Sequence, residues 1–198
     1  MHKQFGTVVC IDIEATCWEK GMKPDDQVNE IIEIGLCFLD TFSLTISKPE
    51  RLLVKPQQST VSAFCTQLTS LTQQQLDTEG LSFPLACWLL KKSYKTDQYV
   101  WASFGAYEQK LFEQQCLDGL ALYPFGPWHL NIQLLTGLGM GLLQTPGMQR
   151  ALQLVKLPSE GSAHRAADDA YNTARILALF LSRMRGSVDL NNASTENE

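Results

Sequence analysis

The chain alternates between short apolar runs rich in β-branched residues and longer segments with helical spacing. Residues 7–11 and 31–39 are almost continuously apolar, which predicts two buried strands. A third strand is expected at 51–54, closed by Pro56, and would complete an antiparallel meander with the first two. A fourth buried strand is expected at 99–104.

Helical spacing dominates the rest of the chain. Helices are expected at 70–76, 83–92, 107–116 and 167–184, and a short strand leading into a helix within 127–141. The last helix is the clearest, because apolar or small side chains recur at helical spacing until Gly186. A meander followed by strands that alternate with helices predicts an α/β fold with a mixed central sheet. We expect a single domain over residues 1–185 and a disordered tail over 186–198, which has little to bury.

Composition narrows the class of protein. The 198 residues are 44% hydrophobic, which suffices for a substantial core and excludes a disordered chain. Sixteen basic against 21 acidic residues give a net charge of −5, which argues against coating nucleic acid through a basic surface. A nuclease that brings its own cations stays possible, because they would neutralise an acidic cleft.

The cysteines and the N-terminus indicate the cellular setting. Six cysteines show neither a C-x-x-C pair nor zinc-type spacing with histidine, so we expect reduced thiols. No long apolar signal segment opens the chain, and no run reaches the length of a membrane span. The expectation is a cytoplasmic protein without membrane contact; the sequence indicates no particular protein partner.

Two carboxylates follow the first apolar run. Asp12 and Glu14 are two positions apart on a predicted strand, so their side chains point to the same face. Such a pair repels unless a divalent cation holds both groups ionised. The spacing alone is a weak signal, because it recurs at Asp77 and Glu79 in a polar segment, where we expect two solvated charges.

A second group of polar residues precedes the last helix. Asp169 shares a helical stripe with Thr173 and Leu177, which are expected to face the core, whereas Asp168 is turned away. Asp169 is therefore the better metal ligand, and Asp168 the better helix-terminal charge or cap. His164, in the preceding loop, could take a proton from metal-bound water, although a lone loop histidine is more often a surface residue.

Glu108 is a third acidic element, just after the predicted strand at 99–104 and in the first turn of the next helix. A lone glutamate there is commonly an ordinary helix-start charge. Glu108 is a candidate for a metal site because of its position along the chain relative to the other acids. Acids at the ends of distant segments are what a carboxylate-lined metal cleft would require.

Four runs together carry a family resemblance: VVCIDIEATCWE at 8–19, FCTQLTSLTQQQLD at 64–77, SFGAYEQKLFEQQC at 103–116 and HRAADDAYNTARIL at 164–177. The chain resembles the DEDD-type 3′-to-5′ exonucleases of the His subclass. It is most similar to the branch of histone-mRNA 3′ exonucleases and sporulation-inhibitor-type exonucleases. The resemblance covers about residues 7–184 and implies an RNase H-like mixed five-stranded sheet flanked by helices.

The resemblance also implies roles for individual residues. Asp12, Glu14 and Asp169 would bind one of two divalent cations, Mg²⁺ or Mn²⁺, with Asp12 also reaching the second. His164 would be the general base. Glu108 stands where the family usually has aspartate, and that acid acts largely through water near the second metal.

Six residues are implied as contacts to the 3′-terminal nucleotides: Ala15, Thr16, Trp18, Phe64, Leu68 and Tyr107. The first two would offer backbone or hydroxyl contacts, and the other four would pack on bases. Burial in the core is an equal alternative for these four, because sequence does not distinguish stacking from burial.

The expected activity is removal of nucleoside 5′-monophosphates from the 3′ end of a single strand, with RNA favoured over DNA by resemblance. Three alternatives remain. The glutamate at position 108 permits a catalytically weakened nucleic-acid-binding or regulatory protein. The same carboxylates could also serve an RNase H-like endonuclease or another metal phosphohydrolase, or a DNA-proofreading exonuclease.

Overall fold

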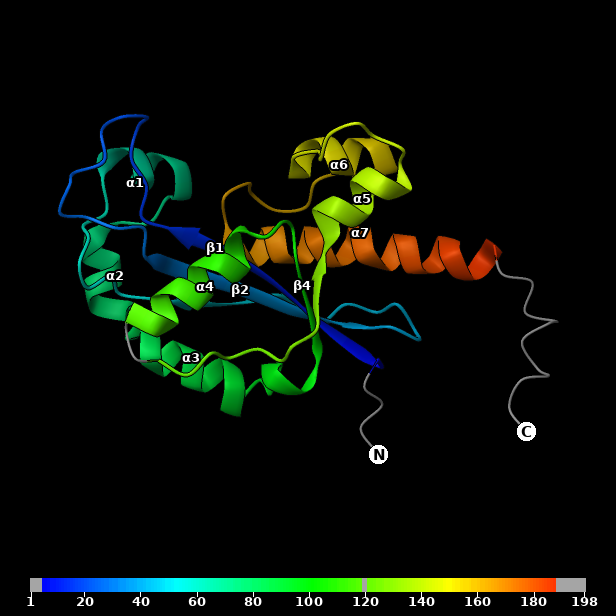
Figure 1. The fold of residues 1–198 in the computed structure, drawn as a ribbon, viewed down its shortest axis with the longest axis horizontal. Helices are drawn as coiled ribbons and strands as arrows, with labels where there is room; N and C mark the ends of the chain where they lie inside the picture. Colours follow the sequence, from blue (N-terminus) through cyan, green and yellow to red (C-terminus); the bar gives the residue numbers. More distant parts are fainter. Residues whose placement is uncertain (1–4, 119–120, 188–198) are drawn as a thin grey trace.

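The computed structural model describes residues 5–118 and 121–187, which form a mixed sheet with helices on both faces (Figure 1). Its described strands are β1 (Thr7–Ala15), β2 (Ile31–Asp40), β3 (Glu50–Leu53), β4 (Val100–Ser103) and β5 (His129–Asn131), in the order β3-β2-β1-β4-β5. The first three pair antiparallel, and β4 and β5 continue the sheet in parallel. The predicted meander and mixed five-stranded sheet are confirmed, with β1 at the centre.

The described helices are α1 (Ala63–Thr69), α2 (Gln73–Glu79), α3 (Phe83–Lys92), a short 3-10 helix η1 (Thr96–Gln98), α4 (Tyr107–Asp118), α5 (Ile132–Gly139), α6 (Met148–Val155) and α7 (Ala166–Ser187). The predicted helix at 83–92 has the observed bounds. Two helices, α1 and α6, were not predicted. Each has only seven or eight residues, which is too short for helical periodicity to stand out.

The helix predicted at 70–76 is wrong at its start. Ser70 ends α1 in the left-handed conformation, with φ of 62°. Thr72 then begins α2, because its hydroxyl accepts a hydrogen bond from the Gln75 amide at 3.2 Å. Ser62 caps α1 in the same way through the Cys65 amide at 2.9 Å. The two capping hydroxyls therefore begin two separate helices, α1 and α2, where the sequence pattern predicted one.

The C-terminal boundary also differs from the prediction. Helix α7 continues through Ser187, so residues 186 and 187 belong to the helix and not to a tail. A glycine near a helix end often stops the helix, but Gly186 makes no such stop here. The remainder of the predicted tail, residues 188–198, lies outside the described residues.

Strand β1 separates two apolar layers. Val9, Ile11 and Ile13 pack into one core cluster together with side chains of α3 and α4. Val8 and Cys10 face the opposite cluster, which includes side chains of α6 and α7. Because strand side chains alternate between faces, the next two positions on the α7 side are 12 and 14. The apolar α7 face of β1 thus ends in the two carboxylates.

The start of α7 lies directly on the sheet at Gly35 of β2. A Cβ atom at this position would overlap the backbone of Ala166 and Ala167. Gly35 is also the register partner of Asp12 on β1. The close approach permitted by glycine therefore brings the first turn of α7 beside Asp12.

All six cysteines are free thiols, as expected, and five of them are buried.

Among the helices of residues 5–118 and 121–187, none combines the length and the apolar character needed to cross a membrane.

Substituting Gly35→Ala should lower the free energy of unfolding by about 3 kcal/mol, the upper range for overpacking, because the clash involves backbone atoms. Gly137→Ala is the matched control, since its Cβ would lie 3.8 Å from the nearest atom, Thr145 Cα, in ordinary contact. Urea unfolding of both variants measures the difference. Equal stability of the two would contradict the close helix–sheet approach.

Candidate active site

Three carboxylates from two distant segments converge where β1 meets α7. Asp12 and Glu14 come from β1, and Asp169 comes from the first turn of α7. Each offers an oxygen, and the three oxygens lie within 4.8 Å of one another. Oxygen ligands in this number and type suit a hard divalent cation such as Mg²⁺ or Mn²⁺. The sequence expectation that these residues meet is confirmed; their roles as ligands stay predictions.

The three acids are electrostatically strained without a cation. Burial, Asp169 and Glu33 raise the pKa of Glu14 to about 8, and Arg165 partly offsets them. Burial and then the Glu108 charge hold the pKa of Asp12 well above its usual range. The pKa of Asp169 is also raised, mainly by burial. A divalent cation would reverse these shifts, because it favours the ionised form of every carboxylate.

Glu108 stands beside this group without belonging to it. It lies in the first turn of α4, its side chain is buried, and its Oε2 atom has no hydrogen-bond partner among the described residues. After burial, Glu108 is the largest influence on the pKa of Asp12. A buried carboxylate oxygen without a partner is unfavourable in a folded protein. Its position fits a second cation on the Glu108 side of Asp12.

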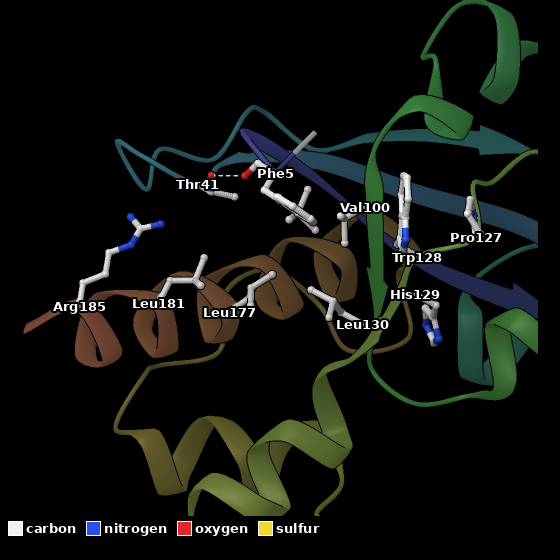
Figure 2. Close-up of a pocket in the computed structure, with 11 residues that line it drawn as sticks. Phe5, Thr41, Val100, Pro127, Trp128, His129, Leu130, Leu177, Leu181 and Arg185 are labelled. Atoms are coloured by element: carbon white, nitrogen blue, oxygen red, sulfur yellow. Dashed lines mark hydrogen bonds between the residues drawn. The ribbon is translucent and has the colours of Figure 1, made fainter. Parts of the chain in front are cut away.

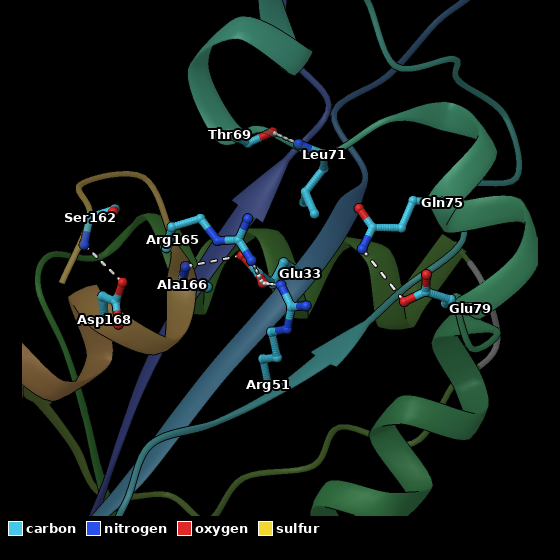
Figure 3. Close-up of polar contacts among 10 residues, drawn as sticks. All are labelled: Glu33, Arg51, Thr69, Leu71, Gln75, Glu79, Ser162, Arg165, Ala166 and Asp168. Atoms are coloured by element: carbon cyan, nitrogen blue, oxygen red, sulfur yellow. Dashed lines mark hydrogen bonds and ion pairs between the residues drawn. The ribbon is translucent and has the colours of Figure 1, made fainter.

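His164 lies in the exposed loop before α7 and has a left-handed backbone, with φ of 61°. Its amide donates a hydrogen bond to Asp169 Oδ2 at 2.9 Å, so the predicted base and a predicted ligand are linked through the backbone. The loop is held to α7 at a second point, where the Ser162 amide donates to Asp168 Oδ2 at 2.8 Å (Figure 3). Asp168 is therefore a charge in the first turn of α7, as predicted, and its carboxylate accepts a hydrogen bond from the preceding loop.

Glu33 and Arg165 were not identified from the sequence. Glu33 of β2 is fully buried, and its Oε1 atom lies 3.2 Å from Arg51 Nη1 and 3.6 Å from Arg165 Nη2. Its Oε2 atom accepts a hydrogen bond from the Ala166 amide at 3.1 Å, at the start of α7 (Figure 3). A signal was present, since a charged residue inside the apolar run 31–39 must be paired if that run is buried.

An apolar cavity of about 480 Å³ lies away from the carboxylates (Figure 2). Its walls include Phe5, Val8 at the start of β1, and Leu177 and Leu181 in the second half of α7. None of the converging acids lines it. The candidate active site is therefore defined by its carboxylates and not by this cavity.

Residues 9–177 match the RNase_T family, described as Exonuclease. The chain belongs to this exonuclease family. It is 32% identical over 190 residues to human 3′-5′ exoribonuclease 1, across 89% of this chain and 53% of the relative. The exonuclease chain thus spans about half the length of that curated relative.

Solved structures confirm the RNase H-like fold of the exonuclease and its resemblance to the His subclass. The nuclease domain of 3′hExo, described as a DEDDh family member bound to rAMP, has a TM-score of 0.79 and 27% identity, covering 92% of this chain and 95% of that one. A structure described as 3′-end specific recognition of histone mRNA stem-loop by 3′-exonuclease has a TM-score of 0.76 and 27% identity, covering 91% and 84%.

Two predicted substrate contacts of the exonuclease are occupied by internal bonds. The Thr16 hydroxyl donates to the Val28 carbonyl at 3.0 Å and accepts from the Glu30 amide at 2.9 Å. This hydroxyl therefore anchors the loop after β1, and its contact with a substrate stays a prediction. The buried Ala15 has its carbonyl in a 3.5 Å contact with Cys65 Sγ, which leaves its backbone role a prediction.

The four predicted base-stacking residues are not part of the closed core. Tyr107 is 52% exposed and Leu68 is 37% exposed, and Trp18 and Phe64 are half-buried. Partial burial raises the pKa of the Tyr107 hydroxyl, with further contributions from Cys17, Glu108 and Glu14. Tyr107 is thus near the acidic group, and the contact of these four side chains with bases stays a prediction.

The second Asp-x-Glu pair of the exonuclease confirms that context distinguishes the two. Asp77 and Glu79 lie on α2 and are exposed. Asp77 pairs with Lys55 Nζ at 2.9 Å, and the hydrogen bond from Lys55 lowers its pKa. These two are solvated charges, as expected, and provide matched control positions.

The metal-free exonuclease should lose stability as pH rises from 4.5 to about 8, the ordinary and the folded pKa of Glu14. Ionising Glu14 is harder in the folded than in the unfolded protein, so each pH unit in this window removes up to about 1.4 kcal/mol. Glu14→Gln should make the free energy of unfolding depend less on pH. The dependence that remains comes from Asp12 and Asp169, whose pKa values are also raised. Urea unfolding in EDTA measures it, with Glu79→Gln as the control, and an unchanged slope in Glu14→Gln would refute the assignment.

Proposed function

We propose that this exonuclease removes nucleoside 5′-monophosphates from the 3′ end of single-stranded RNA with two divalent cations, Mg²⁺ or Mn²⁺. The observation that carries the proposal is the convergence of Asp12, Glu14 and Asp169, together with the unpaired oxygen of Glu108, whose charge raises the pKa of Asp12. The human relative is named an exoribonuclease, which favours RNA over DNA. Location in the cytoplasm stays a prediction from the sequence.

The acids divide naturally between two cations. Asp12, Glu14 and Asp169 would hold one, and Asp12 with Glu108 would hold or approach the second through water. When bound, such cations lower the pKa of an attacking water and neutralise the leaving 3′ oxygen. Without them the acidic cleft would repel a phosphate chain, so the net charge of −5 is compatible with an enzyme that grips only a short 3′ end.

His164 is proposed as the general base. The bond from its amide to Asp169 fixes the backbone of the histidine relative to a metal ligand, while its exposed position leaves the imidazole able to approach a bound water. A neutral imidazole has a ring nitrogen that can accept the proton of that water. The imidazole would later release the proton to solvent.

The terminal nucleotides are proposed to lie across Tyr107 and the exposed apolar side chains after β1 and on α1. Tyr107 and Leu68 offer exposed surface, and Trp18 and Phe64 offer part of their rings. Aromatic surface stacks on bases without strong sequence preference. Lys23 Nζ lies 5.8 Å from the centre of the Trp18 ring, and it adds a positive charge close to this surface.

Asp12→Ala should remove nearly all turnover of a 5′-labelled single-stranded RNA in Mn²⁺, because Asp12 would be a ligand of both proposed cations. His164→Ala should lower kcat by about 10²–10⁴-fold, the usual share of a general base. Asp77→Ala, in the exposed Asp-x-Glu pair, is the matched control and should keep wild-type activity.

Two further substrates, an RNA with a blocked 3′ end and a DNA strand, distinguish the exoribonuclease from an endonuclease and from a proofreading exonuclease. A blocked 3′ end should stop the exonuclease, whereas an RNase H-like endonuclease would still cut. A DNA strand of the same sequence should be degraded more slowly than RNA, and the reverse order would favour a proofreading enzyme. Turnover that survives in Asp12→Ala would overturn the proposed site.

Glu108 distinguishes an active enzyme from a catalytically weakened relative. Glu108→Gln should lower kcat by about 10–100-fold, as expected for a residue that acts near a metal through water. Glu108→Asp should leave kcat unchanged or lower, because the shorter side chain draws the carboxylate away from Asp12. Steady-state kinetics measure both, and a large gain in Glu108→Asp would show that the wild type is impaired.

A further inference from the structure

Glu33 is a buried charge that the proposed mechanism does not use. It is the register partner of Glu14 across the β1–β2 ladder, and side chains of directly paired residues lie on the same face of a sheet. Glu33 has no exposed surface, yet it is not one of the three converging acids. Its neighbours explain this, because both of its oxygens are occupied by other groups.

Two of those partners belong to the segment that carries His164 and Asp169. Oε2 accepts from the Ala166 amide at 3.1 Å, which places a negative charge at the start of α7, where the helix dipole favours it. Oε1 lies 3.6 Å from Arg165 Nη2, and Arg165 directly follows His164. Arg51 of β3 reaches the same oxygen at 3.2 Å from the other side (Figure 3). One carboxylate therefore joins three segments behind the acidic group.

Arg165 has two acidic neighbours. It is paired with Glu33, and Glu14 is the register partner of Glu33 on the same face of the sheet. Glu14 is therefore an alternative partner for an arginine released from Glu33. A guanidinium on Glu14 would compete directly with a divalent cation for the same oxygens.

We propose that Glu33 is a positioning residue that fixes the start of α7 and keeps Arg165 from pairing with Glu14, so that the three acids remain available to a divalent cation. The inference rests on the proposed function for the identity of the metal site. It adds a determinant of cation affinity that touches neither the cation nor the RNA.

Arg51 completes the arrangement. A buried carboxylate is unfavourable unless positive groups compensate its charge. Arg51 and Arg165 together compensate the charge of Glu33. Arg51 is 39% exposed and Arg165 is 27% exposed at their side chains, so water reaches both while Glu33 remains dry.

The test compares Mn²⁺ affinity in Glu33→Gln, Arg165→Gln and the double variant, by calorimetry and by electron paramagnetic resonance of free Mn²⁺. Glu33→Gln should raise the Mn²⁺ Kd by about 10–100-fold, the usual range for a residue beside the ligands, because the freed Arg165 then competes for the Glu14 oxygens. Adding Arg165→Gln should recover most of that loss, because the competing cation is then absent. At saturating Mn²⁺, kcat of Glu33→Gln should return towards wild type, which a general structural defect would not allow.

Arg175→Gln is the control, because Arg175 holds the same loop through the Pro158 carbonyl at 2.6 Å but does not contact Glu33. It should keep the wild-type Kd. A wild-type Kd in Glu33→Gln, or an equal loss in Glu33→Gln and the double variant, would overturn the inference. If Glu33→Gln does not fold, Arg165→Gln alone decides: it should leave the Mn²⁺ Kd unchanged or lower, and a raised Kd would overturn the inference.

The titrations require no RNA, so the two proposals fail separately. A wild-type protein that binds no Mn²⁺ would contradict the metal site of the proposed function. A wild-type protein that binds Mn²⁺ without degrading RNA would contradict the proposed substrate alone. The inference about Glu33 is judged only from the differences between variants.

Discussion

The docking of the first turn of α7 on strand β2 is the constraint on which the active site depends. Gly35 permits backbone contact with Ala166, and Glu33, two residues earlier on the same face, accepts the Ala166 amide. Because α7 is rigid, fixing Ala166 also fixes Asp169 less than one turn later. The acids of β1 are then met by a third from a segment more than 150 residues away.

That contact concentrates negative charge in a place where folding alone would avoid it. The pKa values of Asp12, Glu14, Glu108 and Asp169 are all raised, with burial as the first cause. The apolar layers on both sides of β1 must therefore stabilise a site that opposes folding when no cation is present. Such a conflict between stability and local charge is typical of sites arranged for function. It also makes cation binding and folding of this region interdependent.

Helices with a long amphipathic pattern were predicted more accurately from the sequence than short ones. The observed bounds of α3 agree with the pattern, since its apolar stripe and its proline near the start act over the same ten residues. The pattern failed over α1 and α2, where the left-handed Ser70 and the capping Thr72 divide one polar run into two helices. The reason is physical, because a single backbone dihedral or capping hydroxyl reverses the outcome without changing the hydrophobic pattern. The same holds at Gly186, where α7 continues.

The sequence by itself determined which faces the acids occupy. The two-residue strand period put Asp12 and Glu14 together, and the helical stripe of Thr173 and Leu177 turned Asp169 inward. Only the tertiary structure decided which groups pair across segments. It committed the Thr16 hydroxyl to a loop, enclosed Glu33 between two arginines, and placed Glu108 beside Asp12. Side-chain direction is a local property of the backbone, whereas burial and partner identity arise from contacts between distant segments, which no local pattern encodes.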